Sequence, residues 1–197
     1  MFPRIHLFGD YNLTVEKEGY YKESIDINIT KDNINDPKLL NIHVCEALKP
    51  NQFRAVLKWG NTPKDLDASI WIGKGKEVID YGNKKNLDGT ASKDISSEDG
   101  NSIETITFLG KSNDLIQYFV TNASNETTFD SSNATVTLYQ GNQQPIVTKV
   151  PPNHNERIWN VFNVDKGVVK FLNLFKNKFI RRFKKRLLKR KLKKKKY

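Results

Sequence analysis

The sequence predicts an all-β protein, an antiparallel β-sandwich, followed by a basic amphipathic α-helix at the C-terminus. Three observations indicate this fold class. Between Tyr11 and Val164, apolar and polar residues alternate with a period of two, in short runs separated by Gly, Asn, Asp and Pro clusters. Helix signals are absent from that region. After Gly167 the apolar period changes to about 3.6, which is typical of a helix.

The strands follow from the alternating runs, taken in order along the chain. Between them, Gly141-Asn142 is typical of a short polar turn, and residues 83–102 are expected to form a long loop. Strands so closely spaced, joined by short turns, favour an antiparallel sandwich. The expected strands are residues 11–15, 24–29, 40–45, 53–59, 68–72, 76–81, 104–108, 116–121, 134–139, 145–150 and 157–164.

Two breaks in the pattern divide the chain into three parts. The first is at residues 47–52, where Pro50 removes a ladder donor between two strong strands. The second is at residues 165–167, where the period changes. We therefore expect a partial β-sandwich segment over 1–48, a β-sandwich over 53–165, and a basic helix with a disordered lysine-rich end over 166–197.

Charge is unevenly divided between the body and the tail. Residues 166–197 hold 16 of the 33 Lys and Arg residues and no Asp or Glu, whereas residues 1–165 hold 17 basic and 22 acidic residues. The net charge of +11 is therefore a property of the tail, and the body has a net charge of −5. This distribution argues against a protein that binds nucleic acid along its whole length.

The segment 8–30 resembles the closing strands of a carboxypeptidase regulatory-like, transthyretin-like β-sandwich. The similarity is carried by a Gly-x-Tyr strand and by a Glu-Gly-Tyr turn, at Gly9, Tyr11, Glu18, Gly19 and Tyr20. Glycine at the turn supplies a backbone angle that other residues resist. The earlier strands of such a domain would lie upstream of Met1, so the resemblance predicts either a longer precursor or a reduced domain.

The segment from Phe53 to about Gly167 resembles a bacterial-type, YfaP-like family of β-sandwich domains found in exported and cell-surface proteins. Its signature is a Trp-Gly-x-x-Pro-x-Asp-Leu-Asp core, matched at Trp59, Gly60, Pro63, Asp65, Leu66 and Asp67. The resemblance implies a non-catalytic binding or structural module. It offers no established activity to carry over.

A calcium site is one reading of the acidic residues after Pro63. On a strand, Asp65, Asp67 and Ser69 share one face, and Asp94 and Asp99 from an acidic loop would add the further oxygens that calcium requires. The alternative is structural: Asp65 bonds the backbone amides of its own turn, and Asp67 pairs with a nearby lysine. Calcium is the one cofactor that the sequence suggests.

Nothing in the sequence indicates an enzyme. His43 and Cys45 would share a face of a strand, but no residue is recognisably placed to orient the imidazole, and phosphate-loop, CxxC and HExxH motifs are absent. A single cysteine also excludes an internal disulfide. Trp59, Trp71 and Trp159 are expected to be core or half-buried sheet residues rather than a platform for sugar rings.

The tail has an apolar stripe with helical spacing, flanked by cations. The stripe consists of Val168, Leu172, Phe175, Phe179, Phe183 and Leu187, with Phe171 and Ile180 beside it. The residues expected to contact membrane or nucleic acid are Phe171, Phe175, Phe179, Arg181, Arg182, Phe183, Lys184, Lys185 and Arg186. A transmembrane helix is not expected from this tail, because its lysines would have to lie in the apolar interior of the membrane.

Four roles for this tail remain open. An amphipathic helix at an anionic membrane uses both faces, because phenylalanine and leucine insert while lysine and arginine contact the headgroups. Nucleic-acid binding, or a nuclear address, uses the charge alone. Docking in a groove of a partner protein is the third role, and a merely solvated terminus is the fourth.

The sequence therefore predicts a binding or structural sandwich, held peripherally at a membrane, or alternatively an intracellular nucleic-acid-associated protein. The ligand of the sandwich would be an unknown protein or glycan. A surface or secreted location follows if the N-terminus is truncated, and otherwise an intracellular one that is membrane-peripheral or nuclear. Asn-x-Ser/Thr sequences mark Asn122, Asn125 and Asn133 as candidate glycosylation sites of an exported protein.

Overall fold

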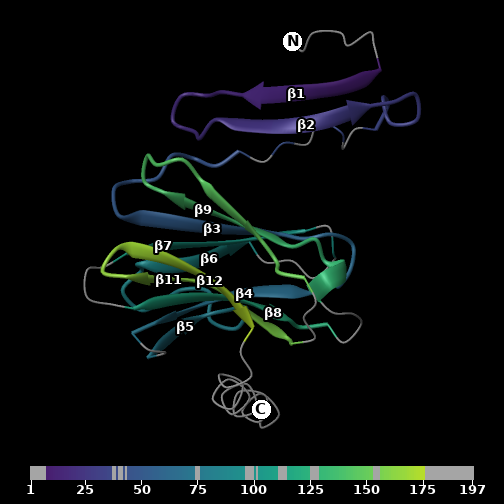
Figure 1. The fold of residues 1–197 in the computed structure, drawn as a ribbon. Coiled ribbons are helices and arrows are strands. Elements are labelled where there is room, and N and C mark those ends of the chain that lie inside the picture. Colours follow the sequence, from purple (N-terminus) through teal and green to yellow (C-terminus); the bar gives the residue numbers. More distant parts are fainter. Residues whose placement is uncertain are drawn as a thin grey trace. The chain divides into compact units, whose positions relative to one another are not determined.

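The structure is a computed structural model that describes residues 8–36, 39, 42, 44–73, 76–95, 100, 102–110, 115–124, 129–152 and 156–175. The chain divides into two compact units, Met1–Ala47 and Leu48–Tyr197. Both units are built from antiparallel strands in the parts described (Figure 1). The predicted all-β class is therefore confirmed.

The first unit is based on a β-hairpin. Strand β1 (Gly9–Val15) pairs antiparallel with β2 (Glu23–Ile29) over all seven residues of each. One face of the hairpin is polar, and there Asn12 Nδ2 donates to Asp26 Oδ1 at 2.8 Å. Gly19 has a φ of 78° in the connecting turn, as expected for a glycine at this position.

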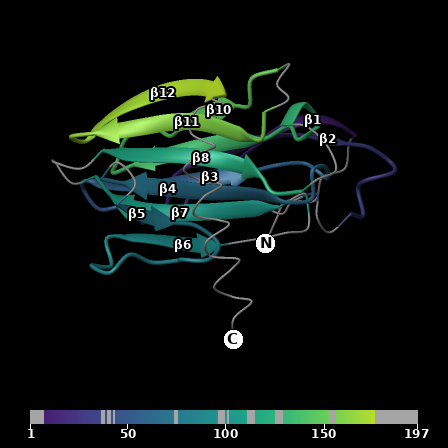
Figure 2. The same ribbon diagram turned by 90° about the horizontal axis from the view of Figure 1, so that it is seen from below.

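The second unit is a sandwich of two five-stranded antiparallel sheets. The first sheet has the order β10-β9-β3-β7-β6, and the second has the order β12-β11-β8-β4-β5. Figure 1 shows them as stacked layers, and Figure 2 shows the second sheet from below. The strands are β3 (Gln52–Lys58), β4 (Leu66–Ile72), β5 (Glu77–Ile79), β6 (Ala91–Ile95), β7 (Ile103–Leu109), β8 (Ile116–Asn122), β9 (Thr135–Gln140), β10 (Ile146–Lys149), β11 (Ile158–Asp165) and β12 (Val168–Phe175), with a short 3₁₀ turn at Phe129–Ser131.

The main core lies between these sheets. Alternate residues of each central strand point inward, so the apolar side of every run is removed from water. Within the first sheet, the rings of Phe53 and Phe108 stack with centroids 5.3 Å apart, and in the second sheet those of Tyr118 and Phe162 stack at 4.8 Å. Trp159 is fully buried in the same core.

Two of the expected elements in the body differ from the structure. In the segment expected to be strand 40–45, the described residues Ile42, Val44 and Cys45 are not in a strand. The long loop expected over 83–102 contains β6 instead. The alternation of β6 is hard to recognise because one of its inward positions is Lys93, a charged residue.

The helix expected from Val168 is wrong for Val168–Phe175, which forms β12. Lys166 and Gly167, with φ of 50° and 77°, make a two-residue turn that returns the chain alongside β11, so Asp165 pairs with Val168. Positive φ at both central residues is the geometry of a tight β-hairpin. Residues 176–197, the rest of the expected helix, lie outside the described residues.

Candidate functional site

Three charged side chains meet at the open edge of β4, each from a different strand. Lys93 of β6 places Nζ 2.8 Å from Glu104 Oε2 of β7 and 3.4 Å from Asp67 Oδ1 of β4. The side chains of Lys93 and Glu104 are fully buried, and that of Asp67 is 16% exposed. The cluster therefore links the first sheet to the second.

This charged cluster takes the place of a missing strand beside β4. Strand β5 pairs with β4 only from Ile70 to Ile72, so no described strand pairs with Ala68 on that side. Glu104 Oε2 accepts the Ala68 amide at 2.6 Å, and Lys93 Nζ donates to the Ala68 carbonyl at 3.3 Å. Buried main-chain groups need partners, and here a lysine and a glutamate from the opposite sheet supply them.

Burial dominates the electrostatics of the cluster. It raises the pKa of Glu104, because removal from water penalises the carboxylate, although Lys93 acts in the opposite direction. The charge of Glu104 also acts on the pKa of Tyr118. Burial first, and then Glu104, raise the pKa of the Tyr118 hydroxyl well above its usual range. That hydroxyl has no hydrogen-bond partner among the described residues.

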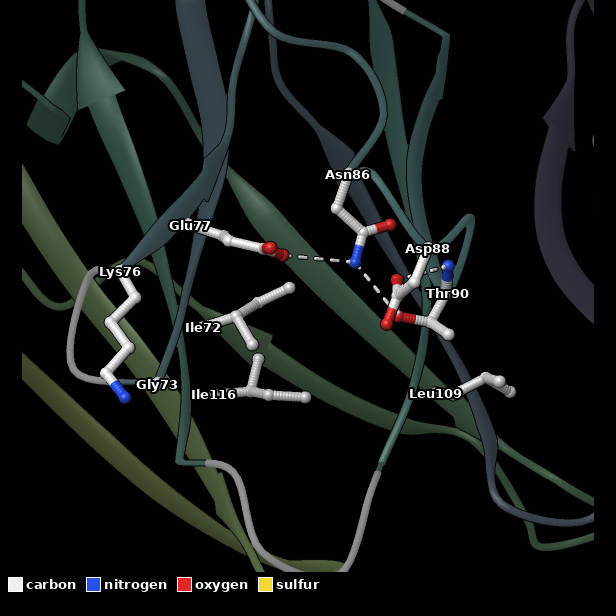
Figure 3. Close-up of a pocket in the computed structure, with 9 residues that line it drawn as sticks. All are labelled: Ile72, Gly73, Lys76, Glu77, Asn86, Asp88, Thr90, Leu109 and Ile116. Carbon is white, nitrogen blue, oxygen red and sulfur yellow. Dashed lines mark hydrogen bonds between the residues drawn. The ribbon is translucent and has the colours of Figure 1, made fainter.

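A small pocket opens between the sheets, where the β4–β5 turn approaches the loop before β6. It has a volume of about 160 Å³, and Figure 3 shows the nine residues that line it. Ile72 and Ile116 form its apolar side, and Figure 3 shows both side chains pointing toward the space between the polar groups. A volume of this size is below the several hundred Å³ typical of sites for drug-sized ligands.

The polar side of the pocket is organised around Asn86. Its Nδ2 donates to Thr90 Oγ1 at 2.9 Å and to Glu77 Oε2 at 3.3 Å (Figure 3). Its Oδ1 accepts the Ala91 amide at 2.8 Å. Asp88 Oδ1 accepts the Thr90 hydroxyl at 2.6 Å. These bonds stabilise the loop before β6, so the polar groups have a structural role that needs no ligand.

Of the expected calcium ligands, the structure describes Asp65, which is half-buried just before β4, together with Asp67, Ser69 and Asp94. Asp67 pairs with Lys93, as the structural alternative predicted. Asp94 is exposed on β6, where its two carboxylate oxygens accept the hydroxyls of Ser92 and Thr107, each at 2.6 Å. Ser69 is buried, and Asp99 lies outside the described residues. Within the described part of the chain, no three His, Cys, Asp or Glu side chains are placed to hold a metal ion.

The tail residues expected to contact membrane or nucleic acid fall into two groups. Phe171 and Phe175 lie on β12 and pack against the core, with ring centroids 5.7 Å from Phe162 and 5.5 Å from Phe129 respectively. These two side chains therefore contribute to the packing of the sandwich. The remaining residues lie outside the described part: Phe179, Arg181, Arg182, Phe183, Lys184, Lys185 and Arg186.

The other singled-out residues have plain locations. Trp59 and Trp159 are buried in the main core, and Trp71 is buried in a second cluster with Val78, Phe119 and Ile158. This confirms the expectation that the tryptophans are packing residues. Among the glycosylation candidates, Asn122 is buried and Asn133 is exposed, while Asn125 lies outside the described residues. Cys45 is half-buried. His43 lies outside the described residues.

Sequence reasoning missed Lys93, and it included Glu104 only as the first residue of the expected strand 104–108. A lysine two residues after Ala91 would have been a signal, once that run was recognised as a strand with one face turned inward. Lysine is rarely fully buried without a partner, so an inward lysine predicts a buried acid nearby.

No helix in the described portion is long and apolar enough to span a membrane.

Comparison with known proteins gives the fold alone. No family model matches the chain, and no curated protein matches it. One similar solved structure is the crystal structure of a protein of unknown function, SAV2460. The two have a TM-score of 0.50 and 16% sequence identity, and the match covers 67% of this chain and 95% of that one. At this identity the likeness extends to the β-sandwich architecture and not to an activity.

Proposed function

We propose that this protein is a non-catalytic β-sandwich module held at anionic membrane surfaces by its C-terminal segment, residues 176–197. The observation that carries the proposal is the separation of charge from fold. Strand β12 ends at Phe175, and the 22 residues after it contain 14 Lys and Arg and no acidic residue. The chain up to residue 175 has 19 basic and 22 acidic residues, so it contributes no cationic surface overall.

The composition of the segment suits a membrane better than a polyanion alone. Each Lys or Arg near an anionic surface contributes about 1 kcal/mol of attraction. Phe179, Phe183 and Leu187 follow one another at intervals of four, so a helix would place them on one face, where they could enter the acyl boundary. Nucleic-acid binding would need the charges only, and would leave these apolar residues without a role.

The non-catalytic part of the proposal is supported by the roles of the buried charges. Lys93 and Glu104 bond the main chain of β4, and the polar residues of the small pocket bond one another. The resemblance of residues 53–167 to sandwich domains of exported and surface proteins points in the same direction. We accordingly place the module at a cell surface or in an exported protein.

The test is sedimentation of the full chain with lipid vesicles. We expect binding to vesicles that contain phosphatidylserine and no binding to pure phosphatidylcholine. The triple variant Phe179→Ala, Phe183→Ala, Leu187→Ala keeps every charge and should bind much more weakly, whereas Leu174→Ala, at an exposed position of β12, should bind like the natural chain. Equal binding of the triple variant would contradict insertion. Preferential binding of nucleic acid over vesicles, with steep salt dependence, would instead support the intracellular nucleic-acid alternative.

A further inference from the structure

We propose that Lys93 and Asp67 become joined by an intramolecular isopeptide bond, with Glu104 carrying the proton, so that β6 of the first sheet is covalently linked to β4 of the second. The three residues form the buried charged cluster described above. This modification is independent of the membrane proposal, because it concerns only the interior of the sandwich.

The reacting groups are already in contact. Lys93 Nζ is 3.4 Å from Asp67 Oδ1, so the amine lies beside the carboxyl group that it would attack. Glu104 Oε2, 2.8 Å from the same nitrogen, is the base within hydrogen-bond reach. The Ala68 amide and carbonyl hold this carboxylate and the amine in position. Groups held together in this way react faster than free groups, because the entropy cost of bringing them together has already been met.

The reaction balances without any other reagent. Glu104 takes a proton from the Lys93 ammonium and passes it to the Asp67 carboxylate, which becomes the neutral acid. The free amine then attacks Asp67 Cγ, and the N–C bond forms. Glu104 accepts the proton that the nitrogen loses and returns it to the departing hydroxyl, which leaves as water. The products are one amide and one water molecule, and Glu104 is regenerated.

Burial favours this outcome in two ways. Lys93 and Glu104 are completely removed from solvent, so the reaction occurs where little water competes with the amine. The amide also replaces the charges of Lys93 and Asp67 with one neutral group, and keeping ions out of water is unfavourable. Burial raises the pKa of Glu104, which favours the protonated form in which this residue hands its proton on.

The decisive experiment is the intact mass of the full chain, folded, incubated until the mass is constant and then denatured. The bond predicts a mass lower by one water molecule than the sequence requires. Tryptic digestion should yield one cross-linked species that contains both Asp67 and Lys93, with no cleavage after Lys93. A mass without this loss, and separate peptides, would overturn the proposal, and this measurement requires no variant to fold.

Variants then test each role. Lys93→Met should show the full mass of its own sequence, whereas Lys84→Met, at an exposed lysine nearby, should still lose water. Asp67→Asn should react with loss of ammonia and reach the same final mass as the natural chain. Glu104→Gln should remain unlinked, because the proton carrier is gone. A cross-link that forms as fast in Glu104→Gln as in the natural chain would overturn the role of Glu104.

Discussion

Replacement of Lys93 tests whether the buried charged cluster holds the edge of β4. In Lys93→Met the side chain keeps most of its length but loses its charge, so Glu104 is left buried without its cation. Removing one partner of a buried ion pair typically costs about 3–5 kcal/mol of unfolding free energy. Because Glu104 can take up a proton, and its pKa is already raised, we expect the lower end of this range under acidic conditions.

The double variant Lys93→Met, Glu104→Met gives the sharper result. For an isolated buried pair, two apolar replacements are often neutral or stabilising. Here they would leave the Ala68 amide and carbonyl without the partners that Glu104 and Lys93 provide. Each unsatisfied buried group costs about 1–3 kcal/mol, so the double variant should lose about 2–6 kcal/mol.

The assay is urea unfolding followed by tryptophan fluorescence. The reference and both variants should also carry Asp67→Ser, so that no bond to Lys93 can form and only the ionic contacts are compared. The expected order is the reference as most stable, with both variants clearly below it. A double variant as stable as the reference would refute the idea that this pair substitutes for a strand beside Ala68.

Three further outcomes follow from the structure. Folding raises the pKa of Glu104 above its usual 4.5, so its contribution to stability is complete at low pH and is lost as the pH rises through the folded value; urea titrations at several pH values should show this fall in the Asp67→Ser reference and not in the same chain with Glu104→Gln. Tyr118→Phe removes a buried hydroxyl without a partner among the described residues, so the free energy of unfolding should stay equal or rise by about 1 kcal/mol, and a clear loss would contradict this account. Gly167→Ala should destabilise the protein by about 1 kcal/mol because Gly167 has a positive φ, whereas in a helix the same change would stabilise, so the sign of the shift in urea midpoint distinguishes the two structures.

Local pattern was sufficient for the central strands of the sandwich. Strands β3, β4, β7, β8 and β9 are predicted because most of their inward residues are apolar and turn formers lie between them in the sequence. These runs are buried on at least one face, and the period of two is then required by the packing. The sandwich class followed directly.

The helix wrongly predicted for Val168–Phe175 shows that apolar spacing alone can mistake a strand for a helix. Strand β12 carries apolar residues at positions facing both sides, with Phe171 and Phe175 turned toward the core and Val168 and Leu174 exposed. The pairing with β11 is also interrupted, since Phe171 pairs with Phe162 and the next described pair involves Leu174. Such a strand has apolar residues three and four positions apart by coincidence, which is the spacing of an apolar helix face. The better signal was the Lys166-Gly167 dipeptide after an alternating run, which favours a hairpin.

The buried cluster depended on information that local sequence does not contain. An aspartate paired with a lysine was expected at Asp67, yet nothing in the pattern identified Lys93 as the partner. Asp67 lies on β4 and Lys93 on β6, which belong to different sheets. The two residues meet because β5 is short and leaves the side of β4 open at Ala68. Packing between sheets is a non-local property, so the site had to be read from the structure.

Hydrogen–deuterium exchange of the full chain, with and without phosphatidylserine vesicles, tests the division of labour between sandwich and tail most directly. In buffer, Val168–Phe175 should be protected as part of the second sheet. With vesicles, new protection should appear after Phe175 while the exchange of the sandwich strands is unchanged. Protection confined to the sandwich, or no protection beyond Phe175 at any vesicle concentration, would contradict a membrane role for the cationic segment.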